Sequence, residues 1–295
     1  MNNIVLRTKS SVKALLPRSL RIWMAERRRA EQERRSKELF ENNLRKTDIF
    51  LVGHPKSGNT WMAYMLAILA NNDYKKRVNI SNVGEFIPTI HEADHRIAEY
   101  SNLSDPRIFR NEGPKYPELY PKTIYILRDP RSALLSYYHH CVHDTGRTDW
   151  KIADFVDEMI TQGCIRTLEP FLIRWDRQVE AWLERAQSQP VTFVKYEDLM
   201  RDCYAVLERL NDFLGLECDE NIITMAVERG GFSNMRKDEK KYGAESYPGE
   251  QGKKGFFVRK GKIDSWKEEM PDQVIEKIEK SFYPTMKKMG YLDKV

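Results

Sequence analysis

The chain alternates between short, mainly apolar runs and longer stretches in which apolar residues recur every three or four positions. The short runs predict strands at residues 48–52, 123–127 and 191–194, and the run at 123–127 is of the buried type. Helical spacing marks residues 59–71, 152–162, 171–186, 204–214, 221–229 and 272–288, and Pro130 is well placed to begin one more helix. Strands that alternate with helices predict an α/β fold, a three-layer arrangement in which helices cover both faces of a parallel sheet.

Two segments show neither pattern. Residues 77–110 are predicted to be irregular, and the polar, glycine-bearing residues 233–255 are predicted to form a long flexible loop. The sequence contains no internal repeat and no linker that would separate a second large domain. We therefore expect a helical arm at residues 1–46 and a single domain at residues 47–295.

The arm is predicted to be a basic helix. It holds thirteen Lys/Arg and five Asp/Glu, a net charge of +8, so the formal net charge of +5 leaves −3 for the rest of the chain. The pairs Glu31/Arg35 and Glu33/Lys37 are spaced four residues apart, which stabilises a helix. Because the body is slightly acidic, we do not expect it to bind nucleic acid. The arm is interpreted as a solvated surface helix or, alternatively, as a peripheral contact for a membrane surface or a partner.

Composition limits where the chain is expected to act. Hydrophobic residues make up 41% of the 295 residues, enough for a sizeable core, but no stretch approaches the roughly 20 apolar residues of a membrane span. No apolar run of signal-peptide length opens the sequence. The four cysteines are scattered and form no C-x-x-C pair. These features predict a cytoplasmic protein without a disulfide framework.

The stretch GHPKSGNTW, residues 53–61, connects the first predicted strand to a predicted helix. Such a loop offers backbone N–H groups and a helix N-terminus to an anion, and Gly53 and Gly58 let the backbone approach it closely. In the P-loop of nucleoside triphosphatases the lysine follows the second glycine, whereas Lys56 here precedes it and Asn59 takes its place. The pattern predicts a phosphate-like ligand that needs the lysine inside the loop; an ordinary turn between strand and helix is the alternative.

A second cationic site follows another strand, where Arg128 opens the sequence Arg128-Asp129-Pro130-Arg131. An arginine at the carboxyl end of a parallel strand points into the crevice where open sheets bind ligands, and its planar fork suits a phosphate. Ser136, on the helix that begins at Pro130, could donate to the same phosphate. Asp129 has two interpretations, a Mg²⁺ ligand as in ATPases or the cap of that helix.

The third cationic stretch is Arg259-Lys260-Gly261, and the alternative there is a solvated basic loop. Together the three stretches predict a ligand with two separated anionic ends, and in this order they resemble the motifs of PAPS-dependent sulfotransferases of the cytosolic, small-molecule type. Residues 55–61 are similar to the family's 5′-phosphosulfate loop, with Asn59 where a threonine is usual. Residues 128–136 are similar to its 3′-phosphate motif, and Arg259-Lys260-Gly261 with Trp266-Lys267 to its C-terminal motif. The resemblance extends over about residues 47–270.

The resemblance implies a donor nucleotide, 3′-phosphoadenosine 5′-phosphosulfate (PAPS), with PAP as its product and no required metal. It implies that Lys56 stabilises the charge that develops as the sulfuryl group leaves. Trp61, Phe232 and Tyr196 would contact adenine, although a core position is the alternative for Trp61. The nucleotide-binding residues that it implies are Lys56, Ser57, Gly58, Asn59, Thr60, Trp61, Arg128, Ser136, Tyr196, Phe232, Arg259, Lys260 and Gly261.

The general base departs from the family pattern. The family histidine that accepts the acceptor's proton is replaced by Glu112, within residues 110–114. A carboxylate can serve as base if it reaches the proton, so Glu112 is the first candidate, His91 the second and His54 the third. The alternative for Glu112 is a structural ion pair with Arg110.

These features predict an enzyme that moves a sulfuryl group from PAPS to a hydroxyl or amine of a small molecule. Because an anionic base attracts cations, and Glu85, Glu92 and Asp94 lie in the preceding segment, the hypothesis is a polar, cationic acceptor such as a secondary metabolite. A P-loop kinase and a degenerate nucleotide-binding module are the alternative functions. The family's dimer motif survives here only as Lys267 and Glu276, so either a monomer or a homodimer is expected.

Overall fold

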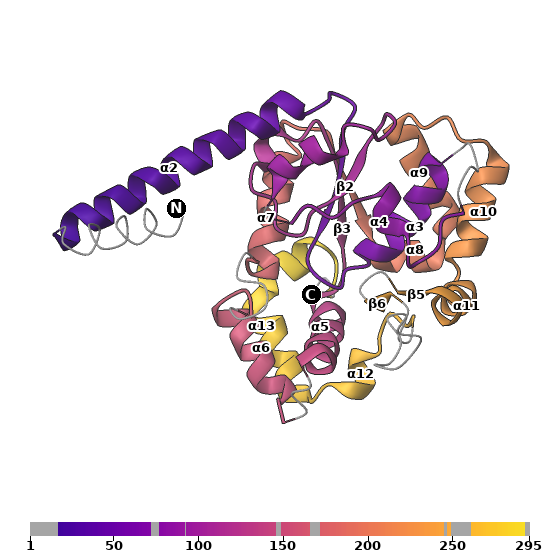
Figure 1. The fold of residues 1–295 in the computed structure, drawn as a ribbon. Coiled ribbons are helices and arrows are strands. Elements are labelled where there is room, and N and C mark those ends of the chain that lie inside the picture. Colours follow the sequence, from indigo (N-terminus) through magenta and orange to yellow (C-terminus); the bar gives the residue numbers. More distant parts are fainter. Residues whose placement is uncertain are drawn as a thin grey trace. The chain divides into compact units, whose positions relative to one another are not determined.

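The structure is a computed structural model that describes residues 17–71, 77–91, 93–145, 149–165, 172–244, 247–248 and 261–292. Its main sheet has four strands in the order β2-β1-β3-β4 (Figure 1). All three neighbouring pairs are parallel, with Leu51 beside Arg110 on one side and Ile124 on the other. The strands are β1 Ile49–Gly53, β2 Ile108–Arg110, β3 Lys122–Leu127 and β4 Val191–Lys195. The predicted α/β fold with a parallel sheet is confirmed.

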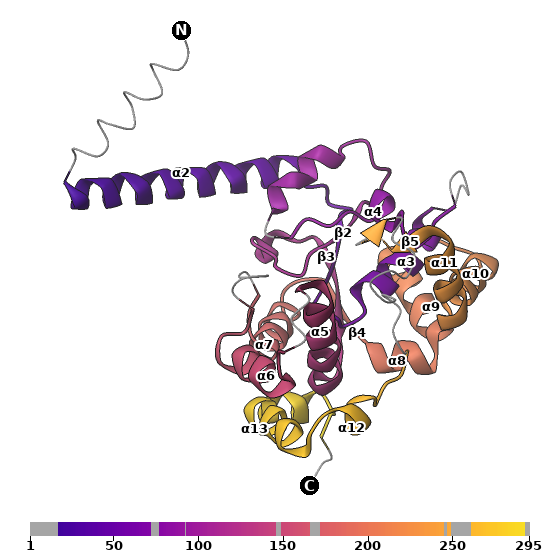
Figure 2. The same cartoon turned by 60° about the horizontal axis from the view of Figure 1, so that its bottom comes forward.

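Helices flank both faces of this sheet, as Figures 1 and 2 show from two directions. The group that includes α3 and α10 lies on one face, and the group that includes α5 and α7 lies on the other. The helices of this part of the chain are α3 Asn59–Ala70, α4 Val83–Phe86, α5 Pro130–Thr145, α6 Ile152–Thr161, α7 Trp175–Arg185, α8 Tyr196–Arg201, α9 Cys203–Leu214, α10 Glu220–Gly230, α11 Phe232–Tyr242, α12 Trp266–Glu269 and α13 Asp272–Lys288, with a 3-10 turn η2 Pro117–Leu119.

Alternate strand residues build two cores, because successive side chains of a strand point to opposite faces. On the α3 face, Leu51 and Ile126 belong to a fully buried cluster that includes most of α3. On the α7 face, Tyr125 lies 5.9 Å from the ring of Trp182. Each large side chain buried in this way contributes roughly 1.5–3 kcal/mol, so the sheet edge that carries the loops is firmly positioned.

Two sequence predictions about irregular segments are wrong. The segment at 77–110 contains α4, the 3-10 helix η1 Asp94–Tyr100 and the strand β2, which forms because it pairs with β1. Residues 233–255 were expected to be a loop, but 232–242 form α11. That helix is polar, yet Met235 and Asp238 are buried, and the hydroxyl of Tyr64 donates to Asp238 at 3.0 Å. A short antiparallel pair, β5 Gly243–Ala244 and β6 Tyr247–Pro248, follows it, and residues 249–255 lie outside the described residues.

The predicted basic helix is α2, Arg18–Asn43, which forms a compact unit of its own with Asp94–Ser101. Within this unit Phe40 is fully buried, and Ser36 Oγ lies 3.1 Å from Nδ1 of His95. The expected Glu31/Arg35 pair forms at 2.5 Å, but both side chains are exposed and the pair contributes little. The remaining described residues form the second unit, which holds the sheet. None of the described helices is both long and apolar enough to cross a membrane.

Candidate functional site

The loop between β1 and α3 is shaped by its two glycines. A Cβ at Gly53 would lie only 2.6 Å from the carbonyl oxygen of Ile126, and Gly58 has φ +108 with Tyr196 packed against it at 2.9 Å from an ideal Cβ. Lys56 also has positive φ, at 63°. The loop therefore makes a tight turn that brings the N-terminus of α3, with its open N–H groups, close to the strand ends.

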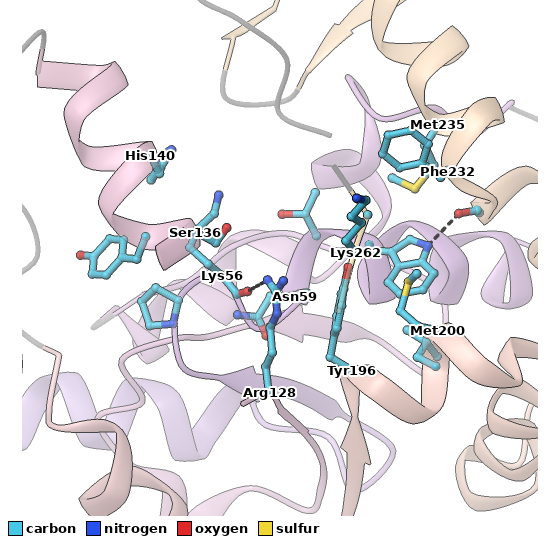
Figure 3. Close-up of a pocket in the computed structure, with 18 of the residues that line it drawn as sticks. Lys56, Asn59, Arg128, Ser136, His140, Tyr196, Met200, Phe232, Met235 and Lys262 are labelled. Carbon is cyan, nitrogen blue, oxygen red and sulfur yellow. Dashed lines mark hydrogen bonds between the residues drawn. The ribbon is translucent and has the colours of Figure 1, made fainter. Parts of the chain in front are cut away.

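A cavity of about 640 Å³ opens over this loop, within the size range of small-molecule sites. It gathers residues from β1 to α11 and from the segment at 261–265 (Figure 3). The sequence-predicted residues that line it are Lys56, Gly58, Asn59, Thr60, Trp61, His91, Glu112, Arg128, Ser136, Tyr196, Phe232 and Gly261. Arg259 and Lys260 lie outside the described residues, and Ser57 is fully buried beneath the loop. Residues that are far apart in the sequence thus meet in one pocket.

Arg128 links the two predicted anion sites. It directly follows β3, and its Nη1 donates to the carbonyl oxygen of Lys56 at 2.8 Å (Figure 3). Its guanidinium also stacks over the ring of Tyr196, 4.2 Å from the centroid. Burial raises the pKa of Tyr196, while the charge of Arg128 opposes that shift. Arg128 is therefore held in place at the wall of the pocket that Ser136 also lines.

Aromatic rings line the pocket, and Phe232 lies across it from Ser136 and His140 in Figure 3. The indole N–H of Trp61 donates to the carbonyl of Gly230 at 2.8 Å, and the ring lies edge-on to Tyr196 at 5.5 Å. Trp61 thus lines the pocket while also packing against the core, so both interpretations hold in part. Phe232 is 42% exposed, and a Cβ at Gly261, whose φ is +60, would come within 2.5 Å of its ring. These surfaces suit a flat aromatic ligand.

Buried polar atoms of the loop show whether its residues fit a phosphosulfate. The Oγ of Ser57 is buried and has no hydrogen-bond partner among the described residues, as expected of a group that donates to a bound anion. His54 is also fully buried, which lowers its pKa to about 4 and keeps it neutral. Its Nδ1 donates to the carbonyl of Pro55 at 3.3 Å, and the described pocket lining does not include it. The third candidate for the base is therefore poorly placed.

The first two candidates for the base lie side by side. The carboxylate of Glu112 accepts from Nδ2 of Asn59 at 2.8 Å, and its Oε2 lies 4.0 Å from Nε2 of His91. Burial raises the pKa of Glu112, while Asn59, Lys56 and Arg110 act in the opposite direction. The expected alternative, an ion pair with Arg110, is not among the ion pairs of the described residues. Arg110 instead points Nη1 at Thr60 Oγ1, at 3.5 Å.

Sequence reasoning assigned no role to several residues that line the pocket. Arg110 stands where the family has a lysine, and Lys262 directly follows the third motif, so position alone could have indicated both. His140 lies one turn after Ser136 on the same helix. These residues, with Lys56, make the described lining rich in nitrogen donors.

Among the described residues, neither Glu85 nor Asp94 provides the expected acidic surroundings of the acceptor. Glu85 is exposed and does not line the pocket, and Asp94 is fully buried within the α2 unit. Glu92 lies outside the described residues. Among the residues that the structure describes, Glu112 is the carboxylate that lines the pocket.

Comparisons with known proteins identify relatives of this chain and of its fold. Residues 46–290 match the family model of the sulfotransferase domain. The amine sulfotransferase of Oryctolagus cuniculus is 24% identical over 265 residues, which are 83% of this chain and 82% of that protein. The 3-beta-hydroxysteroid sulfotransferase of Cavia porcellus is 26% identical over 259 residues, with 84% and 86% covered.

Solved structures agree on the architecture. Retinol dehydratase in complex with androsterone and the inactive cofactor PAP superposes with a TM-score of 0.64 at 21% identity, covering 83% of this chain and 82% of that chain. A mouse sulfotransferase complexed with PAP gives 0.61 at 20% identity, with 82% and 84% covered. At these identities the likeness establishes a shared fold.

Proposed function

The chain belongs to the sulfotransferase family, and from this premise we propose that it transfers a sulfuryl group from PAPS to a small molecule that carries an amine. The observation that carries the proposal is the meeting of Lys56, Arg128 and Glu112 in one cavity. The first two supply cations for a nucleotide with two anionic ends, and the third supplies a base. Two of the relatives were solved with PAP, which supports this donor.

The donor would be held by both walls of the pocket. Lys56, Ser57 and the N–H groups at the start of α3 would bind the 5′-phosphosulfate, and Ser57 Oγ is a buried donor that lacks a protein partner among the described residues. Arg128 and Ser136 would bind the 3′-phosphate, with Arg259 and Lys260 as further predicted contacts. Trp61 and Phe232 would stack on or flank the adenine.

PAPS supplies an activated sulfuryl group whose bond to the bridging oxygen breaks when the acceptor attacks. Glu112 would take the proton from the acceptor's O–H or N–H while the acceptor's lone pair forms the new bond to sulfur. The electron pair of the broken bond leaves with PAP, and Lys56 would neutralise the charge that develops there. Arg110 lines the same cavity, with its Nη1 3.5 Å from Thr60 Oγ1, and there it would help to hold the group in transfer.

The acceptor class follows from the charge of the base. An ionised Glu112 in a partly desolvated pocket favours a cationic acceptor over an anionic one. The similarity to an amine sulfotransferase supports the same choice, although a steroid sulfotransferase is similarly related. Three phenols that differ only in the charge of their tail provide a test: tyramine, 4-ethylphenol and 3-(4-hydroxyphenyl)propionate.

A kinase is less well supported. The Asp129 carboxylate that could hold Mg²⁺ instead accepts from the backbone N–H of Arg131 at 2.9 Å and from its guanidinium at 2.6 Å. That arrangement fits the helix cap interpretation. Lys56 also lies inside the loop, where the triphosphate pattern has no lysine.

Thermal denaturation with nucleotides tests the proposed donor. PAP in the presence of EDTA is expected to raise the Tm, because a ligand that binds only the folded state stabilises it, whereas ATP with Mg²⁺ is expected to leave Tm unchanged. The opposite pattern would favour the kinase. PAP binding together with no transfer to any acceptor would favour the degenerate nucleotide-binding module.

A further inference from the structure

Two departures from the family pattern are in direct contact. Asn59 stands where a threonine is usual and Glu112 where a histidine is usual, and 53 positions separate them in the sequence. In the structure, Nδ2 of Asn59 donates to Oε1 of Glu112 at 2.8 Å. A side-chain amide extends one bond further than a threonine hydroxyl and offers two N–H donors to a carboxylate.

The orientation of the Asn59 amide is set by its surroundings. Its Nδ2 faces two acceptors, the Glu112 carboxylate and the carbonyl of His54 at 3.3 Å. Asn59 is nearly fully buried at the first position of α3, so this amide has little freedom to turn. The backbone of Glu112 is held as well, because Gln178 donates to its carbonyl oxygen at 3.1 Å.

His91 is constrained from the other side. The backbone N–H of Glu112 donates to Nδ1 of His91 at 2.9 Å, so Nδ1 must carry the lone pair. The neutral ring then bears its proton on Nε2, which faces Oε2 of Glu112 at 4.0 Å. Neither nitrogen of His91 can take the proton of the molecule to be sulfated, because the lone pair of Nδ1 is already used and Nε2 is already protonated.

We infer that Asn59, Glu112 and His91 act as one base unit, in which Glu112 takes the proton and the other two are positioning residues for its two carboxylate oxygens. This inference rests on the proposed function. The geometry pairs the two positions: the amide at 59 donates to the carboxylate at 112, and a histidine at 112 would have no need of that amide. His91 is thereby assigned a role other than that of the second candidate base.

The unit has a consequence for the pH profile. Glu112 must be ionised to act, so the acid limb of kcat/KM reports its pKa. Burial raises that pKa, and the amide of Asn59, Lys56 and Arg110 oppose the rise, while His91 faces the second oxygen. Removing the Asn59 donor is therefore expected to move the acid limb to higher pH.

The first experiment is a double-substitution cycle of the full chain, assayed with PAPS and the three matched phenols. Asn59→Thr and Glu112→His are each expected to lower kcat/KM at least about tenfold. The kcat/KM of the double variant is expected to be at least about tenfold higher than the two single losses, multiplied together, would leave. The same substitutions at exposed positions outside the described pocket lining, Asn234→Thr and Glu85→His, serve as controls. Their effects on kcat/KM are expected to multiply, with no coupling between the two positions. Tm measurements exclude unfolding as the cause.

The second experiment does not depend on turnover. ¹⁵N-histidine NMR of the free protein, with His91 assigned by its absence in His91→Gln, is expected to show the Nε2–H tautomer. His91→Gln is expected to retain an acid limb in its pH profile, displaced and with a lower kcat, whereas Glu112→Gln loses turnover.

Three results would each overturn the base unit if PAP binding stays normal. They are effects at 59 and 112 that multiply without coupling, an Nδ1–H tautomer of His91, and loss of the acid limb in His91→Gln. Failure of the wild-type chain to bind PAP would overturn the proposed function instead, and the unit with it.

Discussion

Removing the charge of Lys56 is expected to stop transfer without unfolding the protein. Lys56→Met keeps the side chain in the cavity as far as its Cε position and removes the ammonium group (Figure 3). One preorganised donor at a developing negative charge is worth roughly 10²–10³ in kcat, or about 2.7–4 kcal/mol. Because the charge of Lys56 also lowers the pKa of Glu112, its loss leaves less ionised base, and the deficit is expected to be larger at low pH than at high pH.

The backbone of Lys56 predicts a separate effect on stability. Its φ of 63° costs any residue with a Cβ about 1–2 kcal/mol, and methionine bears the same strain. Lys56→Met is therefore expected to leave the free energy of unfolding within about 0.5 kcal/mol. Lys56→Gly relieves the strain but gives the unfolded chain more conformational freedom. The free energy of unfolding is therefore expected to rise by about 0–1 kcal/mol. The glycine variant should lose as much turnover as the methionine variant.

Single-turnover transfer from PAPS measures the chemical step of these variants, and calorimetry of PAP binding verifies an intact nucleotide site. Lys287→Met, an exposed lysine outside the described pocket lining, is the matched control and should be indistinguishable from wild type. A kcat for Lys56→Met within about threefold of wild type would refute the role in the transition state, which requires at least about a hundredfold loss.

Three further predictions address other parts of the structure. Arg128→Ala should weaken PAP binding in calorimetry more than it lowers kcat at saturation, because its contact with the remote 3′-phosphate is equal in ground and transition states; unchanged PAP affinity would contradict the assignment. Phe40→Ala should lower the free energy of unfolding by roughly 3–5 kcal/mol in denaturant titrations, because that side chain is fully buried, whereas removing residues 1–30 should leave activity and Tm unchanged; equal effects would show that the arm has another role. His54 has a folded pKa of about 4 against an ordinary 6.5, so the stability that it permits is complete above pH 6.5 and falls by roughly 3 kcal/mol as the pH drops to 4; His54→Asn should lose this part of the pH dependence, and an unaltered slope would contradict it.

The parts of the fold that the sequence predicted are those with strong local patterns. β1 and β3 are almost continuously buried, and β4 has a short apolar run although only Val194 in it is fully buried. α13 has the predicted bounds because its apolar residues keep helical spacing from Asp272 to Lys288. β2 was not predicted, because three residues are too few to show the apolar pattern of a strand. Its pairing with β1 decides its conformation. α11 escaped because its buried positions include charged residues that only tertiary partners such as Tyr64 can satisfy.

The candidate site divides in the same way. The loop at 53–58 could be predicted because its glycines and lysine lie together in the chain. The contact between Asn59 and Glu112 could not, because no spacing rule connects the first residue of α3 with a residue that follows β2. The position of His91 beside them depends on how the segment before β2 folds. The two nitrogen–oxygen contacts and the one nitrogen–nitrogen contact that define the base unit exist only in three dimensions.

Transfer of ³⁵S from labelled PAPS, measured in EDTA with the three matched phenols, tests the central claim most directly. We expect labelled product with one PAP released per sulfuryl group transferred, and mass spectrometry will show whether the oxygen or the nitrogen receives the group. Tyramine is expected to exceed 3-(4-hydroxyphenyl)propionate in kcat/KM by at least about tenfold, which corresponds to about 1.4 kcal/mol of attraction to an ionised Glu112. No transfer to any of the three, or a preference for the carboxylate, would contradict the account.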